Sequence, residues 1–256
     1  MIPEISIIIP AFDEAERIGN TLHKIAEHVR KEPREFEIIV VDDGSEDETA
    51  KIADEILARE NVCRYRIMRY EPNRGKGFAV RTGLEAARGR IALFTDADLS
   101  TPIGEMQKLT QPIFAGVCDI AFGSRALDRS LIGTHQPWRR EQGGKVFNLI
   151  VRLLTGMPFW DTQCGFKAFE MLKFRPLLPL MRIDRFGFDV EFLFVGRLNG
   201  LRLQEIPVRW NNDERSKVNV VRDSIRMFNE VREIRRNARL GLYSSQPLMA
   251  ATTPPM

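Results

Sequence analysis

The 256-residue sequence predicts an α/β fold, with a mostly parallel central sheet flanked by helices and a helical extension at the C-terminus. The main observation is that short apolar runs alternate with segments whose apolar residues recur at helical spacing. The connections are short, as in right-handed βαβ units. The early strands are apolar at nearly every position, which is typical of strands buried on both faces of a parallel sheet.

The first half of the chain shows this alternation most clearly. The predicted strands span residues 5–10, 36–41, 65–70 and 91–95. The predicted helices span residues 15–31, 48–59 and 77–88. Polar motifs follow the first, second and fourth strands. Because ligands of open α/β sheets bind beyond the carboxyl ends of the strands, these motifs predict one shared cleft.

The second half is less regular. Strands are expected at 119–124, 161–170 and 203–210, and helices at 145–154, 189–198 and 223–240. Residues 125–140 indicate a polar loop. The segment 244–256 has no charged residue and three prolines, so we expect it to be disordered.

Composition excludes several classes of protein. With 38 Lys and Arg against 35 Asp and Glu, the formal net charge is +3, which gives no case for a dedicated nucleic-acid binder. The cysteines Cys63, Cys118 and Cys164 lack zinc or disulfide spacing and fit a reducing compartment. The N-terminus shows no signal peptide, and no apolar run is long enough to cross a bilayer.

The pair Asp96 and Asp98 follows the fourth strand directly. Two carboxylates one residue apart can face one hard divalent cation such as Mg²⁺ or Mn²⁺, which bridges to substrate phosphates. The alternative is a solvated turn at a strand end.

Three other motifs lie at the same predicted edge. Asp42 and Asp43 could accept bonds from a nucleobase or ribose, or could form a turn and helix cap. Phe12 and Glu14 could stack on and bond to a base, or could be a core residue and a first-turn acid. Lys76, in the basic Gly-flanked loop 73–77, suits a phosphate, although the loop has no P-loop spacing.

Taken in order, these motifs resemble the nucleotide-sugar half of family 2 inverting glycosyltransferases with the GT-A fold. The segments that carry the resemblance are Pro10-Ala11-Phe12-Asp13-Glu14, Val41-Asp42-Asp43-Gly44-Ser45, Asn73-Arg74-Gly75-Lys76-Gly77 and Asp96-Ala97-Asp98. The later segments 123–125, 161–167, 188–191 and 207–210 resemble the branch that glycosylates polyprenyl phosphates. The 161–167 form, Asp-Thr-Gln-Cys-Gly-Phe-Lys, is most similar to dolichyl-phosphate β-glucosyltransferases.

The resemblance implies a division of the chain. Residues 1–212 would form the GT-A domain, with a nucleotide-sugar half at 1–100 and an acceptor half at 101–212. A basic amphipathic helix would span 213–243, and a disordered tail 244–256.

It also implies roles for individual residues. Donor binding would fall to Pro10, Ala11, Phe12, Glu14, Asp42, Asp43, Lys76, Asp96 and Ala97. Asp96 and Asp98 would hold Mg²⁺ or Mn²⁺, with Asp98 as the direct ligand; a third ligand, at or near Ser100, is left open. The acceptor phosphate would be bound by Arg125, by Arg139 or Arg140, and by Lys217. Asp98, Arg125 and Asp189 would be the catalytic residues.

The expected reaction is the metal-dependent, inverting transfer of a hexose to a polyprenyl or dolichyl phosphate. Glucose from UDP-glucose is the first expectation for the hexose. A phosphate monoester is largely ionised at neutral pH, so it can attack without a general base. Asp189 is then expected to position the sugar or acceptor, unless it caps a helix. The alternatives are GDP-mannose or UDP-GlcNAc as donor, a hydroxyl acceptor with Asp189 as base, and a nucleotide-sugar-binding or membrane-scaffold protein without turnover.

Two segments could bind a membrane surface. Residues 146–160 are apolar with basic neighbours, and 223–240 combine apolar residues with several Arg, as in helices that lie on anionic lipid. The alternatives are a core helix and an ordinary packed helix. Six Arg and three acidic residues between 222 and 239 account for the whole net charge of +3. We expect a cytoplasmic enzyme, peripheral at the inner face of the membrane, and leave its oligomeric state open.

Overall fold

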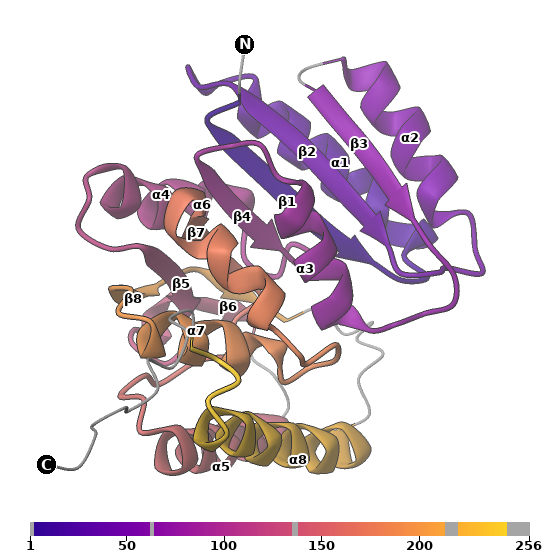
Figure 1. The fold of residues 1–256 in the computed structure, drawn as a ribbon. Helices are drawn as coiled ribbons and strands as arrows, with labels where there is room; N and C mark the ends of the chain where they lie inside the picture. Colours follow the sequence, from indigo (N-terminus) through magenta and orange to yellow (C-terminus); the bar gives the residue numbers. More distant parts are fainter. Residues whose placement is uncertain (1–2, 62–63, 135–137, 213–219, 245–256) are drawn as a thin grey trace, which may run out of the picture.

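The computed structural model describes residues 3–61, 64–134, 138–212 and 220–244. Within these residues a seven-stranded sheet has the order β3-β2-β1-β4-β7-β5-β8, and a two-stranded sheet pairs β6 with β9 (Figure 1). Only β7 runs antiparallel to its neighbours in the large sheet. The predicted mostly parallel α/β sheet is therefore confirmed.

The strands of the large sheet are β1 (Ile5–Ala11), β2 (Phe36–Asp42), β3 (Arg64–Arg69), β4 (Ile91–Thr95), β5 (Ile120–Ser124), β7 (Phe166–Glu170) and β8 (Leu203–Pro207). The small sheet consists of β6 (Ile132–Thr134) and β9 (Trp210–Asn211). The α-helices are α1 (Ala15–Val29), α2 (Thr49–Glu60), α3 (Lys76–Ala86), α4 (Met106–Phe114), α5 (Trp138–Thr155), α6 (Met171–Phe174), α7 (Phe188–Leu198) and α8 (Val220–Arg239). Short 3₁₀ turns span Ile103–Glu105, Arg129–Leu131 and Arg175–Leu180.

The large sheet separates two hydrophobic clusters. Alternation along β1 sends Ile7 and Ile9 to the cluster that holds α1, α2 and α4, and Ile8 to the cluster that holds α3, α6 and α7. Both faces of the sheet are therefore covered by helices, which explains the continuous apolar runs in β1, β2 and β4.

The reversed strand β7 decides where the 161–167 motif lies. In the antiparallel register of β4 with β7, Thr95 pairs with Phe166. The segment that enters β7 therefore lies beside the residues that leave β4, and the Asp96 amide donates to the Gly165 carbonyl at 3.1 Å. The second half of the chain thus delivers its motif to the edge where the first half ends its strands.

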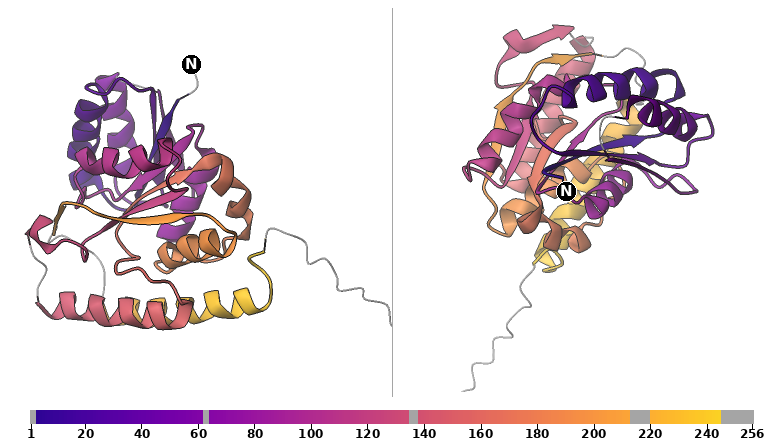
Figure 2. Two further views of the ribbon diagram at one scale, coloured as in Figure 1. Left: turned by 90° about the vertical axis from the view of Figure 1, so that its left-hand side faces the viewer. Right: turned by 90° about the horizontal axis from the view of Figure 1, so that it is seen from above.

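Helices α5 and α8 form a further layer on the lower side of the molecule (Figure 1, Figure 2). They pack against each other, and α8 also contacts α7. Phe147 and Val151 of α5, and Val231 and Ile234 of α8, are buried in the same cluster as the phenylalanines of α7. Each helix therefore has one face fixed to the protein.

Some local predictions were wrong. Helix α4 was not predicted, because Pro112 lies inside it and Pro102 and Gly104 stand just before it. Helix α5 begins at Trp138, seven residues before the predicted start, across the Gly143-Gly144 pair that indicates a break. Residues 161–165 form a loop, and the strand expected at 203–210 is divided between β8 and β9. Apart from Ser244, the tail 244–256 lies outside the described residues.

The C-terminal end of the described chain is anchored by a buried tyrosine. Tyr243 is fully buried, and its hydroxyl donates to Glu191 Oε1 at 2.6 Å. Glu191, on α7, also accepts from the amides of Arg182 and Ile183. Asn199 adds a bond to the Tyr243 carbonyl at 2.8 Å. These bonds tie the segment after α8 to α7.

Replacing Tyr243 with Phe should lower the free energy of unfolding by about 2 kcal/mol, because a buried carboxylate loses one of its donors. Urea denaturation followed by circular dichroism measures the loss. Tyr65→Phe, on the partly buried strand β3, is the matched control and should have a smaller effect. Equal losses in the two variants would contradict an anchoring role for Tyr243.

Candidate active site

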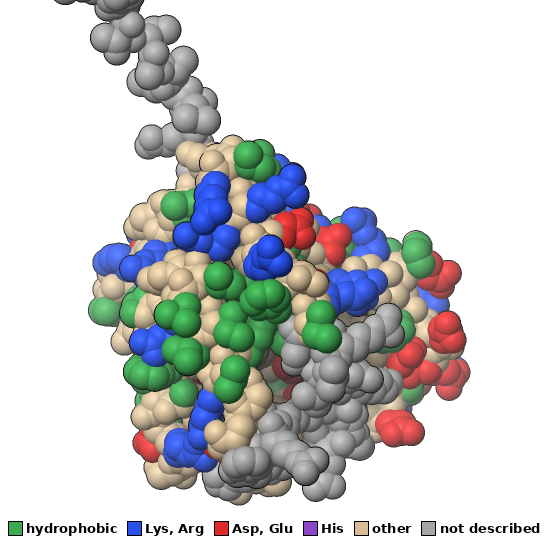
Figure 3. Space-filling model, turned by 90° about the horizontal axis from the view of Figure 1, so that it is seen from below, with side chains coloured by type: hydrophobic (Ala, Val, Ile, Leu, Met, Phe, Trp, Pro, Cys, Tyr) green, Lys and Arg blue, Asp and Glu red, His purple; other side chains and the backbone are tan. Residues whose placement is uncertain are grey.

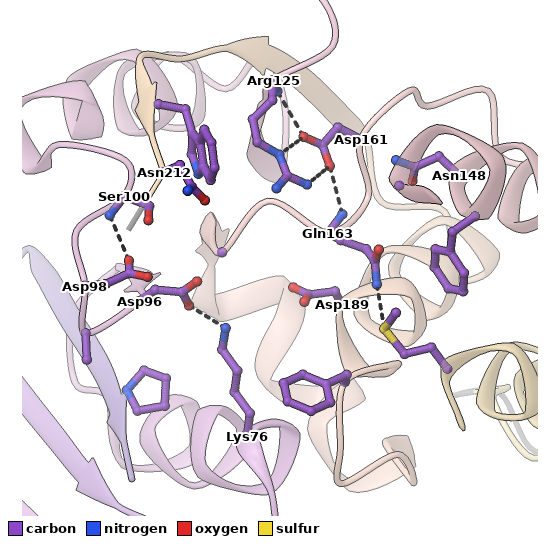
Figure 4. Close-up of a pocket in the computed structure, with 18 of the residues that line it drawn as sticks. Lys76, Asp96, Asp98, Ser100, Arg125, Asn148, Asp161, Gln163, Asp189 and Asn212 are labelled. Carbon is purple, nitrogen blue, oxygen red and sulfur yellow. Dashed lines mark hydrogen bonds and ion pairs between the residues drawn. The ribbon is translucent and has the colours of Figure 1, made fainter. Parts of the chain in front are cut away.

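One cavity of about 1040 Å³ lies at the carboxyl ends of β1, β2 and β4. It continues past the 161–165 loop and the start of α7 to the helix α5. Its wall draws on both halves of the chain, and Figure 4 shows its charged side chains pointing inward from several elements. The single cleft predicted from the polar motifs is therefore present.

The two acids that follow β4 lie side by side on the cavity wall. Asp98 Oδ1 accepts the Ser100 amide at 2.8 Å, which turns the chain back beneath the carboxylate. Leu99, which lies between Asp98 and Ser100, has φ 48°. This backbone conformation is unusual for a bulky residue and is found at functional sites. Burial, and then the charge of Asp96, raise the pKa of Asp98. Among the described residues, no basic side chain forms an ion pair with Asp98.

Lys76 supplies positive charge on the other side. It is the first residue of α3, and its Nζ lies 2.6 Å from Asp96 Oδ1 (Figure 4). Burial by itself lowers the pKa of Lys76, but the charges of Asp96 and Asp189 outweigh it and raise that pKa. The ammonium therefore stays charged where a phosphate could reach it.

The glycine before Lys76 fits against the protein's own backbone. Gly75 has φ 112°, and a Cβ there would lie 2.5 Å from the Asp184 carbonyl oxygen. Its close approach is to the segment before α7. The loop is thereby held so that Lys76 points into the cavity.

A second glycine shapes the acidic pair. A Cβ on Gly165 would overlap the whole carboxylate of Asp96. Only glycine at this position lets the 161–165 loop pass behind Asp96 with the carboxylate in its present place. This gives a steric reason for the glycine in the Asp-Thr-Gln-Cys-Gly-Phe-Lys motif.

Arg125 is held by Asp161 on the far wall of the cavity. Arg125 Nε donates to Asp161 Oδ2 at 2.6 Å and Nη2 to Oδ1 at 2.8 Å, a bidentate pair. Burial raises the pKa of Asp161, but the neighbouring guanidinium outweighs it and lowers that pKa. Because Asp161 is buried and Arg125 lines the cavity, the guanidinium is fixed with its remaining N–H groups available there.

Asp189 lies in the first turn of α7 and lines the cavity from the side opposite the Asp96–Asp98 pair (Figure 4). Gly187 occupies the N-cap position, so the alternative that Asp189 caps the helix was wrong. Burial raises the pKa of Asp189, while Lys167 and then Lys76 act against that rise.

The adjacent acids after β2 have different surroundings. Asp43 accepts from Asn73 Nδ2 and from the amides of Arg74 and Gly75, at 2.8 to 2.9 Å, and lines the cavity. Asp42 is fully buried, accepts the Ser45 amide at 2.9 Å, and is not among the residues that line the cavity. Asp43 therefore shapes the 73–75 loop, and Asp42 shapes the turn after β2.

Most of the predicted site residues meet at this cavity. Those that line it are Pro10, Ala11, Phe12, Glu14, Asp43, Lys76, Asp96, Ala97, Asp98, Arg125 and Asp189. Glu14 is paired with Arg17, at 2.6 Å between Oε1 and Nη2. Arg139 and Arg140 lie in the first turn of α5, but their side chains are outside the described part of the structure, as is Lys217.

Sequence reasoning missed several residues of the wall. The additional polar and aromatic side chains include Arg129, Asn148, Asp161, Gln163, Arg185, Trp210 and Asn212. Asp161 and Gln163 belong to a motif that was recognised, so a role could have been assigned to them. Trp210 likewise belongs to the recognised 207–210 segment. Asn148 meets the cavity only through tertiary packing, and no local pattern marks it.

Cys164, inside the 161–167 motif, has a packing role. It is buried, its Sγ lies 3.8 Å from Thr101 Oγ1, and burial raises the pKa of its thiol to about 12. A thiol that remains protonated is a poor nucleophile.

Comparison with solved structures defines the class of fold. Glucosyl-3-phosphoglycerate synthase from Mycobacterium tuberculosis, solved with UDP, superposes with a TM-score of 0.65 at 18% identity, over 93% of this chain and 80% of that one. The same enzyme has also been solved with Mn²⁺, UDP-glucose and phosphoglyceric acid, at a TM-score of 0.63 and 17% identity, with the same coverage. The fold of this chain is that of the GT-A glycosyltransferases.

Sequence comparison assigns the family. The chain belongs to glycosyl transferase family 2, whose model matches residues 6–177, and it is a glycosyltransferase. It is 30% identical to a dolichyl-phosphate beta-glucosyltransferase of Dictyostelium discoideum over 249 residues, 93% of this chain and 76% of the relative. It is 33% identical to glycosyltransferase AglD of Haloferax volcanii over 89% of this chain, but spans only 36% of that relative.

Gly165→Ala should lower turnover by about 10²-fold, because the added methyl group displaces the Asp96 carboxylate from its place in the site. Steady-state kinetics with the donor and metal measure this. Gly104→Ala is the matched control, because a Cβ at Gly104 meets no atom within 4 Å. Unchanged kinetics in Gly165→Ala would contradict the packing of Gly165 against Asp96.

Proposed function

We propose that this glycosyltransferase transfers glucose from UDP-glucose to a polyprenyl or dolichyl phosphate, with inversion at the anomeric carbon and with a divalent cation. The observation that carries the proposal is the arrangement of charge in one cavity. The Asp96–Asp98 pair and Lys76 lie on one side, and the fixed guanidinium of Arg125 lies on another. The 30–34% identity to dolichyl-phosphate beta-glucosyltransferases supports the choice of sugar and acceptor.

The residues present suit a Mg²⁺ or Mn²⁺ ion that is shared with the substrate. In the described part of the chain no cluster of three or more His, Cys, Asp or Glu forms a closed metal site. Asp96 and Asp98 would hold the ion, with the donor diphosphate and water as its other ligands, the arrangement that Mg²⁺ prefers. Burial and the charge of Asp96 raise the pKa of Asp98, and a cation held beside it would favour its charged form. When bound, the ion would offset negative charge on the departing diphosphate.

Arg125 is suited to orient the acceptor. Its planar guanidinium matches the oxygens of a phosphate, and Asp161 keeps it from rotating. A phosphate dianion held there would attack the anomeric carbon from the side opposite the diphosphate, which inverts the configuration. Because that oxygen is already ionised, no side chain needs to remove a proton.

A membrane surface is the proposed source of the acceptor. Helices α5 and α8 expose hydrophobic side chains at Val146, Leu149, Leu153, Ile225 and Phe228. Figure 3 shows hydrophobic side chains gathered on this face, with Lys and Arg side chains around them. Leu149 also lines the cavity, so this face continues into the site. Among the described residues, no helix is both long and apolar enough to cross a bilayer.

Helices α5 and α8 each have both a packed face and an exposed apolar face. Val151 and Val231 are core residues, while Leu153 and Ile225 are exposed on the outer face. A helix that is fixed to the core on one side and exposes apolar residues next to Arg on the other suits a peripheral attachment to anionic lipid. We propose this attachment at the inner, cytoplasmic face of the membrane.

The direct test measures release of UDP from UDP-glucose with Mn²⁺ or Mg²⁺, with and without a polyprenyl phosphate. Release should require both the metal and the lipid phosphate. GDP-mannose and UDP-GlcNAc are tested in parallel as donors. Transfer to a sugar hydroxyl, with none to the lipid phosphate, would overturn the acceptor assignment.

Asp98→Ala should reduce transfer about a thousandfold, because the stabilisation of leaving-group charge by a metal is worth several kcal/mol. Single-turnover assays with radiolabelled UDP-glucose measure it. Asp54→Ala, at an exposed position on α2, is the matched control and should retain full activity. Full activity of a folded Asp98→Ala variant would refute its role at the metal.

The double variant Leu153→Ser and Ile225→Ser should weaken binding to anionic vesicles at least tenfold, since each residue loses about 1.5–3 kcal/mol of apolar burial. Vesicle co-sedimentation measures this binding. Leu172 and Val117 are exposed to a similar or greater extent on other elements. Leu172→Ser with Val117→Ser is therefore the control, and an equal loss in both doubles would refute a specific α5–α8 membrane face.

A further inference from the structure

A fully buried lysine lies directly behind the active site. Lys167 is the second residue of β7 and has no exposed surface. Its Nζ donates to Asp189 Oδ1 at 2.5 Å and to the Cys164 carbonyl at 2.6 Å. The Nζ also lies 5.3 Å from the centre of the Phe94 ring. Lys167 itself is not among the residues that line the cavity.

The lysine is held by the sheet on both sides. In the register of the sheet it pairs with Phe94 of β4 and with Phe122 of β5. A side chain that starts from a central strand in a packed core has little freedom to follow a moving partner. Lys167 therefore offers Asp189 a fixed point of attachment.

Asp189 stands between this buried lysine and the cavity. Its side chain is almost completely buried, yet it lines the cavity and points toward the space in front of Asp96 (Figure 4). The charged groups that face it are Lys167 from β7, Lys76 from α3 and Asp96 after β4. The described contacts of its carboxylate engage Oδ1.

A buried ion pair is weak evidence for stability, because the desolvation of both ions opposes their attraction. An apolar pair of similar volume would serve the core as well. A pair at the boundary between core and cavity has another use. One partner is fixed in the core, and the other presents a carboxylate to a ligand in a set orientation.

We propose that Lys167 is a positioning residue, which holds Asp189 by Oδ1 so that Oδ2 accepts a hydrogen bond from a hydroxyl of the donor hexose. This rests on the proposed function, because it takes the hexose to lie between the Asp96–Asp98 pair and Arg125. The donor sugar then contacts Asp189, while the nucleotide and diphosphate do not. Lys167 therefore affects the affinity for UDP-glucose and leaves that for UDP unchanged.

The test is titration calorimetry of the full chain with Mn²⁺, comparing UDP-glucose with UDP. In Lys167→Met and in Asp189→Asn, the ratio of the dissociation constant of UDP-glucose to that of UDP should rise about tenfold over wild type, the effect of one charge-assisted hydrogen bond. In the double variant the ratio should rise no further than in Asp189→Asn. The Kd of UDP should stay within about twofold throughout.

Two more variants complete the design. Lys167→Gln, which is one atom shorter and cannot reach Asp189 in the same way, should show the same loss if Lys167→Met does not fold. Lys173→Met breaks a second Lys–Asp pair, with Asp119 at 2.6 Å, in which the lysine is half-exposed and neither partner lines the cavity. This variant should leave the ratio unchanged.

The outcomes separate the two proposals. A wild-type protein that binds neither UDP nor UDP-glucose shows that the donor assignment itself fails. If the wild type binds both, an unchanged ratio in a folded Lys167 variant, or in Asp189→Asn, overturns the role of Lys167. If both Lys167 variants fail to fold, Lys167 is a purely structural residue, and this outcome also overturns its positioning role.

Discussion

The structure depends on keeping several carboxylates close together in one partly buried cavity. Asp96, Asp98, Asp161 and Asp189 come from three different segments of the chain, and burial disfavours the charge of each one it covers. Lys76, Arg125 and Lys167 lie against three of them. Of these four acids, Asp98 alone has no ion pair among the described residues. A carboxylate without a basic partner on the cavity wall suits a site which takes up a divalent cation together with an anionic substrate.

The reversed strand β7 makes this arrangement possible. Running antiparallel between β4 and β5, it brings the 161–165 loop to the carboxyl end of β4. The loop places Asp161 against Arg125 and Gly165 behind Asp96, while Lys167 follows in the strand. A parallel strand in this position would carry the loop to the opposite edge of the sheet. One motif therefore organises three charged groups because of the direction of one strand.

Helices α5 and α8 connect this site with the outer surface. Their inner faces are fixed by Val151, Val231 and the Tyr243–Glu191 bond, so their outer faces keep a constant position relative to the cavity. The contact of Gln163 with Met227, at 3.0 Å, joins α8 directly to the 161–165 loop. A lipid-bound acceptor that approaches from this face would have its phosphate near Arg125.

By itself, the sequence determined the alternation of strands and helices, the shared cleft and most of its acids, because buried parallel strands have continuous apolar runs and their carboxyl ends meet. It also predicted the family, through motifs whose order is preserved. Only the tertiary structure decided that Asp43 lines the cavity and Asp42 does not, that Gly165 lies behind Asp96, and that Lys167 pairs with Asp189. These contacts join residues that are far apart in the chain or depend on strand direction, and local spacing carries no information about either.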